Sequence, residues 1–179
     1  MKPAVVIDTN VLLVANGSHA NASDACRKVC IQRLLVQQSS GVTVIDDDYR
    51  VLSEYQNKTR PNQPKGVGDV FLKWLLQNQG NAARVHRVPI TETAADVFDE
   101  FPDAALQPRF DAPDRKFAAV AHAHPGKPPI WQAADCKWLD WWPALQAKGV
   151  TVEFVCPDDA RRFYTKKFPK RPVPVLPSV

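Results

Sequence analysis

The feature that most constrains the fold is a series of short apolar, β-branched runs that each lead into an acidic residue. The clearest are residues 4–7 before Asp8, residues 42–45 before Asp46, and residues 129–133 shortly before Asp135. Continuous apolar runs of this length are typical of strands that are buried on both faces. Segments with helical spacing separate them. The alternation therefore predicts an α/β fold, with three α/β/α layers around a central, mainly parallel sheet.

The segments between these runs carry helix start and stop signals. Thr9 and Asn10 are expected to cap a short helix, Ser23 to cap a long helix that ends at Gly41, and the acids at 46–48 to open another. Further helices are expected at 69–79, 115–124 and 136–148, with a short one led by Thr91 or Thr93, and further strands at 84–88 and 150–155.

The length of 179 residues fits one domain. We expect that domain to cover residues 1–156, followed by a basic, Pro-rich tail at 157–179 whose end, 169–179, is extended. In this tail, basic residues alternate with Phe163, Tyr164 and Phe168. Such a mixture is typical of a segment that binds a nucleic-acid phosphate backbone. The alternative is a solvated tail whose aromatic side chains pack on the domain. No apolar run approaches the ~20 residues of a membrane span, and the N-terminus lacks the features of an export signal. These features predict a cytoplasmic protein without a membrane partner.

Four cysteines are present: Cys26, Cys30, Cys136 and Cys156. They form no C-x-x-C pair and accompany no export signal, so we expect reduced thiols. Cys26 and Cys30 are one helical turn apart and are expected to pack in the core, with a zinc site that includes His19 as the alternative.

Four acids fall where a parallel sheet would bring them together. Asp8 and Asp135 follow predicted strands, Glu54 lies on the helix after the second strand, and Asp114 opens a later helix. The carboxyl ends of parallel strands line one crevice. Several carboxylates there repel one another unless something neutralises them, and a hard divalent cation such as Mg²⁺ or Mn²⁺ does so well. Each acid also has a structural explanation as a cap or a surface acid, and Asp140 is an alternative to Asp135. Their joint placement favours a metal site.

The same segments resemble the PIN-domain nucleases, which include VapC-type toxin ribonucleases. The matching segments are residues 5–13 (VVIDTNVLL), 51–55 (VLSEY), 114–121 (DRKFAAVA) and 133–139 (AADCKWL). Their order and approximate spacing agree over residues 4–155, with 59–83 as a helical insertion. The resemblance implies a Mg²⁺- or Mn²⁺-dependent endoribonuclease whose catalytic metal ligands are Asp8, Glu54, Asp114 and Asp135.

Neighbouring residues are expected to support this chemistry. Thr9 and Asn10 adjoin the first acid, and Asn10 is expected to orient a ligand or water. Arg115 and Lys116 adjoin Asp114 and are expected either to bind a substrate phosphate or to remain solvated. The expected reaction is hydrolysis of an RNA phosphodiester by metal-activated water, which requires no histidine base.

The biological role has several readings. The resemblance implies, as the first of these, that the protein is the toxin of a toxin–antitoxin pair. It would then bind an antitoxin protein and form a homodimer. The alternatives are an RNA-processing or defence nuclease without an antitoxin, and a non-catalytic PIN-like RNA-binding adaptor. A different enzyme class is the haloacid-dehalogenase-like phosphatases, in which Asp8 would be the nucleophile. These enzymes carry a second aspartate two residues later as the proton donor. Asn10 stands at that position here, and its amide cannot serve as the proton donor.

Overall fold

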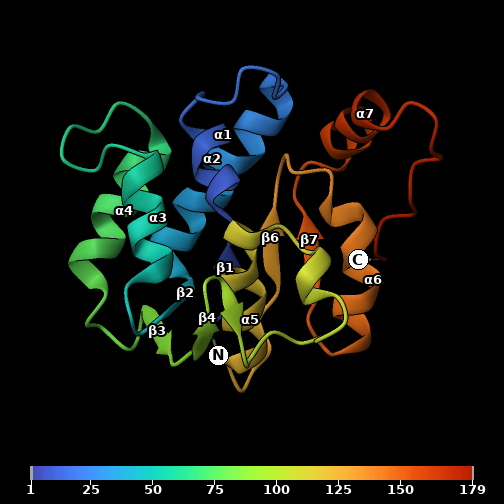
Figure 1. Cartoon of the computed structure of the whole chain (residues 1–179). Coiled ribbons are helices and arrows are strands. Elements are labelled where there is room, and N and C mark those ends of the chain that lie inside the picture. The colour runs from blue at the N-terminus through green and yellow to red at the C-terminus, as the bar shows by residue number, and fades with distance from the viewer. Residues whose placement is uncertain (1, 179) are drawn as a thin grey trace.

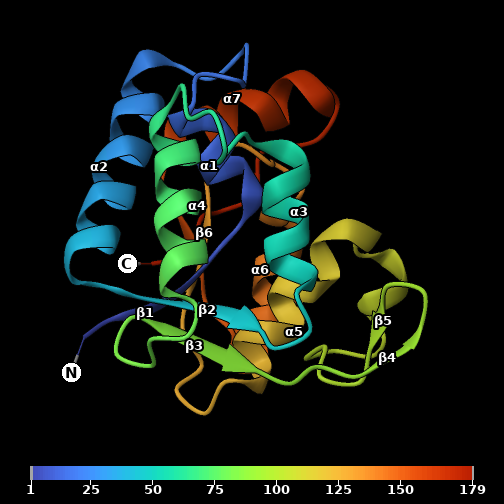
Figure 2. The same cartoon turned by 90° about the vertical axis from the view of Figure 1, so that its left-hand side faces the viewer.

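The fold is described from a computed structural model that covers residues 2–178. A central sheet contains five strands: β1 (Ala4–Ile7), β2 (Val42–Asp46), β3 (Val85–Val88), β6 (Ile130–Gln132) and β7 (Val152–Phe154). Seven α-helices are present in the described chain: α1 (Thr9–Ala15), α2 (Asp24–Ser40), α3 (Arg50–Lys58), α4 (Val67–Asn78), α5 (Arg115–Ala123), α6 (Trp138–Ala147) and α7 (Pro157–Lys167). Figures 1 and 2 show the predicted α/β/α arrangement, with α2 and α5 on opposite sides of the sheet.

The sheet is parallel throughout, and its strand order is β3-β2-β1-β6-β7. β1 lies at the centre, where Ala4 pairs with Val42 on one side and Val6 pairs with Ile130 on the other. The chain first builds the sheet outward from β1 to β3 and later returns to place β6 against β1. This reversal leaves a crevice beyond the carboxyl ends of β1 and β6, where ligands of open α/β sheets bind.

The central strands are buried on both faces, as their sequences predict. Val6, Ile7, Val44 and Ile45 have no exposed surface. The Tyr55 hydroxyl of α3 donates a hydrogen bond to the Ile7 carbonyl, at the last residue of β1. The end of β1 is therefore held firmly where the chain turns into α1.

Two acids that end strands have different roles. Asp46 accepts hydrogen bonds from the backbone N–H groups of Asp48, Arg50 and Val51, so it organises the start of α3 as predicted. Asp8 is the N-cap of α1 and accepts from the Asn10 N–H, so the prediction that Thr9 and Asn10 cap this helix is wrong. The Ser23 cap of α2 is confirmed.

The predicted helix after Thr91 is also wrong, because the segment forms an antiparallel hairpin of β4 (Glu92–Ala94) and β5 (Val97–Phe98). Asp96 takes a left-handed conformation (φ 55°) in the turn. The side chain of Gln107 pairs with both the N–H and the carbonyl of Phe98, whose ring is buried. These tertiary contacts favour an extended backbone, and a local helical pattern cannot reveal them. The following segment contains two short 3₁₀ helices, η1 (Gln107–Arg109) and η2 (Ala112–Asp114).

Residues 157–167 form α7, an element that the sequence pattern does not predict. Pro157 at its first turn, the acids Asp158 and Asp159, and the C-terminal Lys166 and Lys167 suit a helix dipole. Figures 1 and 2 show α7 at the same end of the molecule as α1. Residues 170–178 contain no helix or strand, in agreement with the predicted extended finish.

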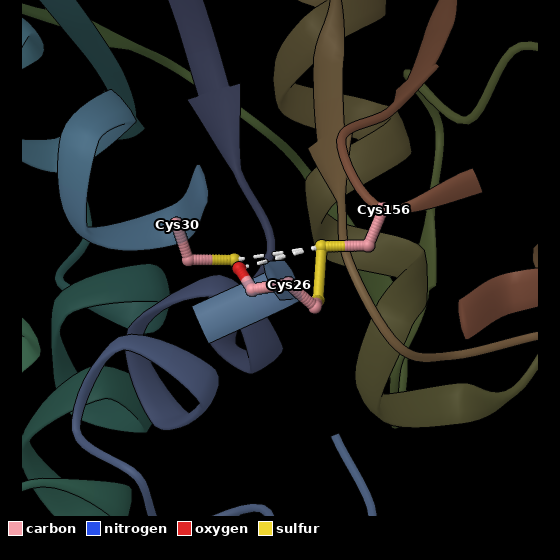
Figure 3. A group of neighbouring side chains, drawn as sticks. All are labelled: Cys26, Cys30 and Cys156. Atoms are coloured by element: carbon pink, nitrogen blue, oxygen red, sulfur yellow. Dashed lines mark hydrogen bonds between the residues drawn. A yellow bond between two sulfur atoms is a disulfide. The ribbon is translucent and has the colours of Figure 1, made fainter. Parts of the chain in front are cut away.

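The cysteines depart from the prediction of reduced thiols. Cys26 and Cys156 form a disulfide between the first turn of α2 and the residue before α7 (Figure 3). Cys30 and Cys136 are free and buried. The two partners are separated by 130 residues in sequence, and only the packing of α2 against the β7–α7 junction brings them together. The prediction that Cys26 and Cys30 lie in the core is confirmed.

No helix within residues 2–178 has both the length and the apolar character that crossing a bilayer requires.

The disulfide generates a stability prediction. Because it closes a loop of 130 residues, reduction should lower the free energy of unfolding by about 2–4 kcal/mol. We expect the melting temperature to fall by roughly 5–15 °C when a dithiol and EDTA are added, measured by circular dichroism. Cys26→Ser should melt like the reduced protein under both conditions. The control Cys136→Ser keeps the disulfide, and an equal fall in its oxidised form would contradict this account.

Candidate metal centre

Asp8 lies deepest in the crevice beyond β1 and is 4% exposed. One carboxylate oxygen accepts the Asn10 N–H at 2.9 Å, whereas the other, Oδ2, is buried without a hydrogen-bond partner among the described residues. A buried carboxylate oxygen without a partner is costly unless something absent from the protein chain satisfies it. This oxygen therefore marks a position for a cationic ligand.

A second group of acids stands at the mouth of the crevice. Carboxylate oxygens of Asp111, Asp114 and Asp135 all lie within 4.8 Å of one another. Asp114 accepts a hydrogen bond from the Trp138 indole at 3.3 Å, and Asp135 accepts the Lys137 N–H at 3.1 Å. Asp111 forms an ion pair with the Lys137 ammonium at 2.7 Å. All three carboxylates are therefore held in place, and each keeps further oxygen lone pairs for a ligand.

Glu54 approaches the crevice from α3. Its carboxylate accepts hydrogen bonds from the Thr9 hydroxyl and from the Lys116 ammonium, the latter at 3.1 Å. Lys116 is only 8% exposed and also donates to the Pro113 carbonyl. Lys116 therefore acts as the buried counter-ion of Glu54, and Thr9 supports the site by holding the same carboxylate.

Asn10 connects the two halves of the site. Its amide nitrogen donates to the Gln132 side chain, and its oxygen accepts the N–H groups of Ala133 and Ala134 at 2.9 and 3.2 Å. The residue that follows Asp8 by two positions thus fixes the turn that leads from β6 to Asp135. Its role in this structure is to position the acids, and both ends of its amide are occupied.

The acids perturb one another electrostatically. Burial raises the pKa of Asp8 to about 7, and the nearby charges of Asp135 and Glu54 add to the rise, while the Asn10 N–H and the Gln132 side chain oppose it. Burial likewise raises the pKa of Asp114 to about 9, with contributions from Asp8, Asp135 and Glu54. The pKa of Asp135 is also raised, and burial is the main cause. Without a cation, the site resists full ionisation.

The acids open into a pocket of about 490 Å³. Three lysines line it: Lys58 from α3, Lys137 before α6, and Lys167 from the end of α7. His19 and Phe163 form an aromatic pair on the same wall, with ring centroids 5.4 Å apart. The pocket thus combines an acidic floor with a cationic and aromatic rim.

The structure brings together Asp8, Glu54, Asp114 and Asp135, because these four predicted acids all line this pocket. Arg115 does not line it, since its guanidinium donates to the carbonyls of Phe110 and Asp96. Asp140 accepts from the Tyr164 hydroxyl and pairs with Arg171, so it is not an alternative to Asp135.

Sequence reasoning missed Asp111, His19 and the lining lysines Lys58 and Lys137. Asp111 lies three residues before Asp114, and that spacing is the only local signal for its membership of the cluster. Lys167 and Phe163 belong to the basic-aromatic tail that the sequence indicated, and α7 directs them to the pocket.

This donor set fits a hard divalent cation. Its ligand atoms are carboxylate oxygens on several elements, which Mg²⁺ and Mn²⁺ prefer. Asp8 adds a buried oxygen, Oδ2, that accepts no hydrogen bond among the described residues, although the Gln132 side chain lies near enough to lower the pKa of Asp8. The cluster keeps no ammonium at Asp8, whereas Glu54 is already paired with Lys116. The group that would share one cation is Asp111, Asp114 and Asp135, whose oxygens lie within 4.8 Å of one another, with Asp8 in the same pocket.

The raised pKa of Asp8 predicts how stability depends on pH. Between its ordinary value of 3.8 and about 7, the folded protein binds more protons than the unfolded chain, so stability falls as pH rises through this window. In EDTA at pH 8, Asp8→Asn should therefore melt about 2–6 °C above the wild type, with the difference disappearing near pH 4. Asn can keep the cap on α1.

Differential scanning calorimetry across pH checks this prediction, with the exposed Asp158→Asn as the matched control. Mn²⁺ should stabilise the wild type more than Asp8→Asn, because only the folded wild type keeps the full ligand set. A destabilised Asp8→Asn at pH 8 in EDTA would contradict the electrostatic reading of the cluster.

Comparison with known proteins adds no assignment: no protein-family model, no curated protein and no solved structure matches this chain. The interpretation of the site rests on the side chains described above.

Proposed function

We propose that this protein is a Mg²⁺- or Mn²⁺-dependent endoribonuclease that hydrolyses RNA phosphodiester bonds at the acidic crevice. The observation that carries the proposal is the unpartnered, buried Oδ2 of Asp8 beside the carboxylates of Asp114 and Asp135. An acid that served only as a helix cap would have no reason to face other acids in a pocket. The resemblance of the acid-bearing segments to PIN-domain nucleases points to the same chemistry.

The residues of the site divide into those that hold a cation and those that position them. Asp111, Asp114 and Asp135, whose oxygens lie within 4.8 Å of one another, would hold it together with Asp8, which lines the same pocket as Glu54, Asp114 and Asp135. When bound, Mg²⁺ or Mn²⁺ supplies Lewis-acid polarisation of a phosphoryl oxygen and a more acidic water. Lys116 and Thr9 fix Glu54, and Asn10 fixes the turn before Asp135.

The rim of the pocket suits a nucleic-acid backbone. Lys58 and Lys167 can each bind a phosphate that flanks the crevice, since ammonium groups recognise phosphate as point charges. The His19–Phe163 pair offers aromatic faces on which an unpaired base can stack. A single strand can present both a phosphate and a stacked base at once, which favours single-stranded RNA as the substrate.

The toxin role, an antitoxin partner and a homodimer come from the resemblance, and a cytoplasmic location is an expectation from the sequence alone. They stay predictions. The disulfide between Cys26 and Cys156 is not what a reducing compartment favours, so it argues against the predicted cytoplasmic location.

The first test is cleavage of end-labelled single-stranded RNAs with Mn²⁺, Mg²⁺ or EDTA. We expect cleavage that requires metal and falls at least ~100-fold in Asp8→Asn, because the amide keeps the shape of the side chain but removes a ligand charge. The matched control Asp158→Asn changes an exposed acid and should cleave normally. Equal cleavage by wild type and Asp8→Asn, with both proteins folded, would exclude this active site.

The second test concerns the rim. In the Asp8→Asn background, Lys58→Ala and Lys167→Ala should each bind single-stranded RNA several-fold more weakly and lower the salt slope of binding by about 0.7. Fluorescence anisotropy from about 50 to 200 mM salt measures both quantities. Lys148→Ala replaces an exposed lysine outside the pocket and should leave binding unchanged. An unchanged slope in both rim variants would place the RNA elsewhere.

A further inference from the structure

A second cluster, the sulfur cluster of Cys26, Cys30 and Cys156, lies apart from the acids. Cys26 and Cys30 are one turn apart on α2, and Cys156 directly precedes α7. The three Sγ atoms all lie within 4.8 Å of one another, and Figure 3 shows them converging from two elements on one point. Their residues are 3%, 0% and 5% exposed, respectively.

The disulfide accounts for only two of these sulfurs. Cys30 is a free thiol whose Sγ lies 4.0 Å from the Cys156 Sγ. A thiol that only filled the core could point in any apolar direction, but this one points at the disulfide. Three sulfurs around one point are the ligand set of a soft metal ion.

We propose that, once the Cys26–Cys156 disulfide is reduced, Cys26, Cys30 and Cys156 bind a thiophilic divalent cation such as Zn²⁺. Zn–S bonds of ≈ 2.3 Å in tetrahedral geometry place neighbouring sulfurs roughly 3.8 Å apart, which the Cys30–Cys156 distance of 4.0 Å already matches. Reduction lets the Cys26 and Cys156 sulfurs separate to the same spacing. In residues 2–178 no fourth Cys, His, Asp or Glu joins the group, so water or an external ligand completes the coordination.

The change from the disulfide to the zinc-bound state takes place in two steps, reduction and metal binding. A dithiol reductant gives two electrons and two protons to the disulfide, which becomes two thiols, while the dithiol becomes its own disulfide. Binding of Zn²⁺ then releases the three thiol protons to solvent and leaves three metal-bound thiolates. An oxidised disulfide such as that of the spent dithiol takes two electrons back from the Cys26 and Cys156 thiolates, which form their S–S bond again while the oxidant becomes two thiols. This removes two of the three ligands and releases Zn²⁺, and Cys30 takes up a proton.

Either state ties α2 to the start of α7. This matters because α7 carries Phe163 and Lys167 to the pocket wall. The metal would replace the covalent crosslink under reducing conditions and keep the same wall in place. The proposal does not depend on the nuclease activity, since the sulfur cluster uses none of the acidic ligands, and soft thiolates and hard carboxylates select different ions.

The test uses Co²⁺ as a spectroscopic substitute for Zn²⁺ with the full chain, reduced by a phosphine and kept without oxygen. We expect a near-ultraviolet sulfur-to-cobalt charge-transfer band that saturates at a single equivalent and is lost when Zn²⁺ is added. The oxidised wild type should give no band. Co²⁺ at the carboxylates cannot produce this signal, so the acidic site does not interfere.

Variants assign the ligands. Cys30→Ser should lose the saturable band although its disulfide can still form, while Cys136→Ser removes a cysteine outside the sulfur cluster and should keep it. The comparison of reduced with oxidised wild type needs no variant. A reduced wild type that is folded by circular dichroism yet gives no band overturns the proposal, as does a band that survives unchanged in Cys30→Ser.

Discussion

Repulsion between carboxylates that are buried side by side is the constraint around which this structure is organised. Asp8, Asp114 and Asp135 share one crevice, and each has its pKa raised by burial and by the charges of other acids. A chain keeps such an arrangement only when rigid elements enforce it. Here the parallel pairing of β1 with β6 and the Asn10 contacts to the turn after β6 supply that rigidity.

Asp46 and Asp8 differ in how many of their carboxylate oxygens accept hydrogen bonds. Both follow buried strands and precede helices. Asp46 has both oxygens occupied by backbone N–H groups of the turn into α3, whereas Asp8 has one oxygen buried and bare. The difference arises from the strand order, because β1 borders the reversal of the sheet and β2 does not.

The end of the chain couples two chemically distinct clusters. α7 begins beside the sulfur cluster and ends at the pocket, so the position of its aromatic and cationic side chains depends on how Cys156 is held. The carboxylates lie at the pocket end of α7, and the cysteine sulfurs lie at its beginning. The segment that the sequence marked as a basic tail is therefore part of the site.

Most of the fold and several of the site residues could be predicted from the sequence. Short apolar runs separated by helical segments predicted the parallel α/β/α fold, because burial of a strand on both faces leaves a local pattern. The acid after β1, the acid after β6, Glu54 on α3 and Asp114 before α5 then lie at the carboxyl edge of that sheet, as the order of elements and the family resemblance predicted. The roles of Lys116, Asn10 and Arg115, the membership of Asp111 and the β4–β5 hairpin were decided only by the tertiary structure.

For the cysteines, too, the sequence determined one part of the arrangement and the tertiary structure the other. The sequence determined that Cys26 and Cys30 share one face of a helix, since 3.6 residues form each turn. Only the folded chain decided that Cys156, 130 residues from Cys26, completes the cluster. Contacts across such separations depend on how whole elements pack, and no short stretch of sequence encodes that packing.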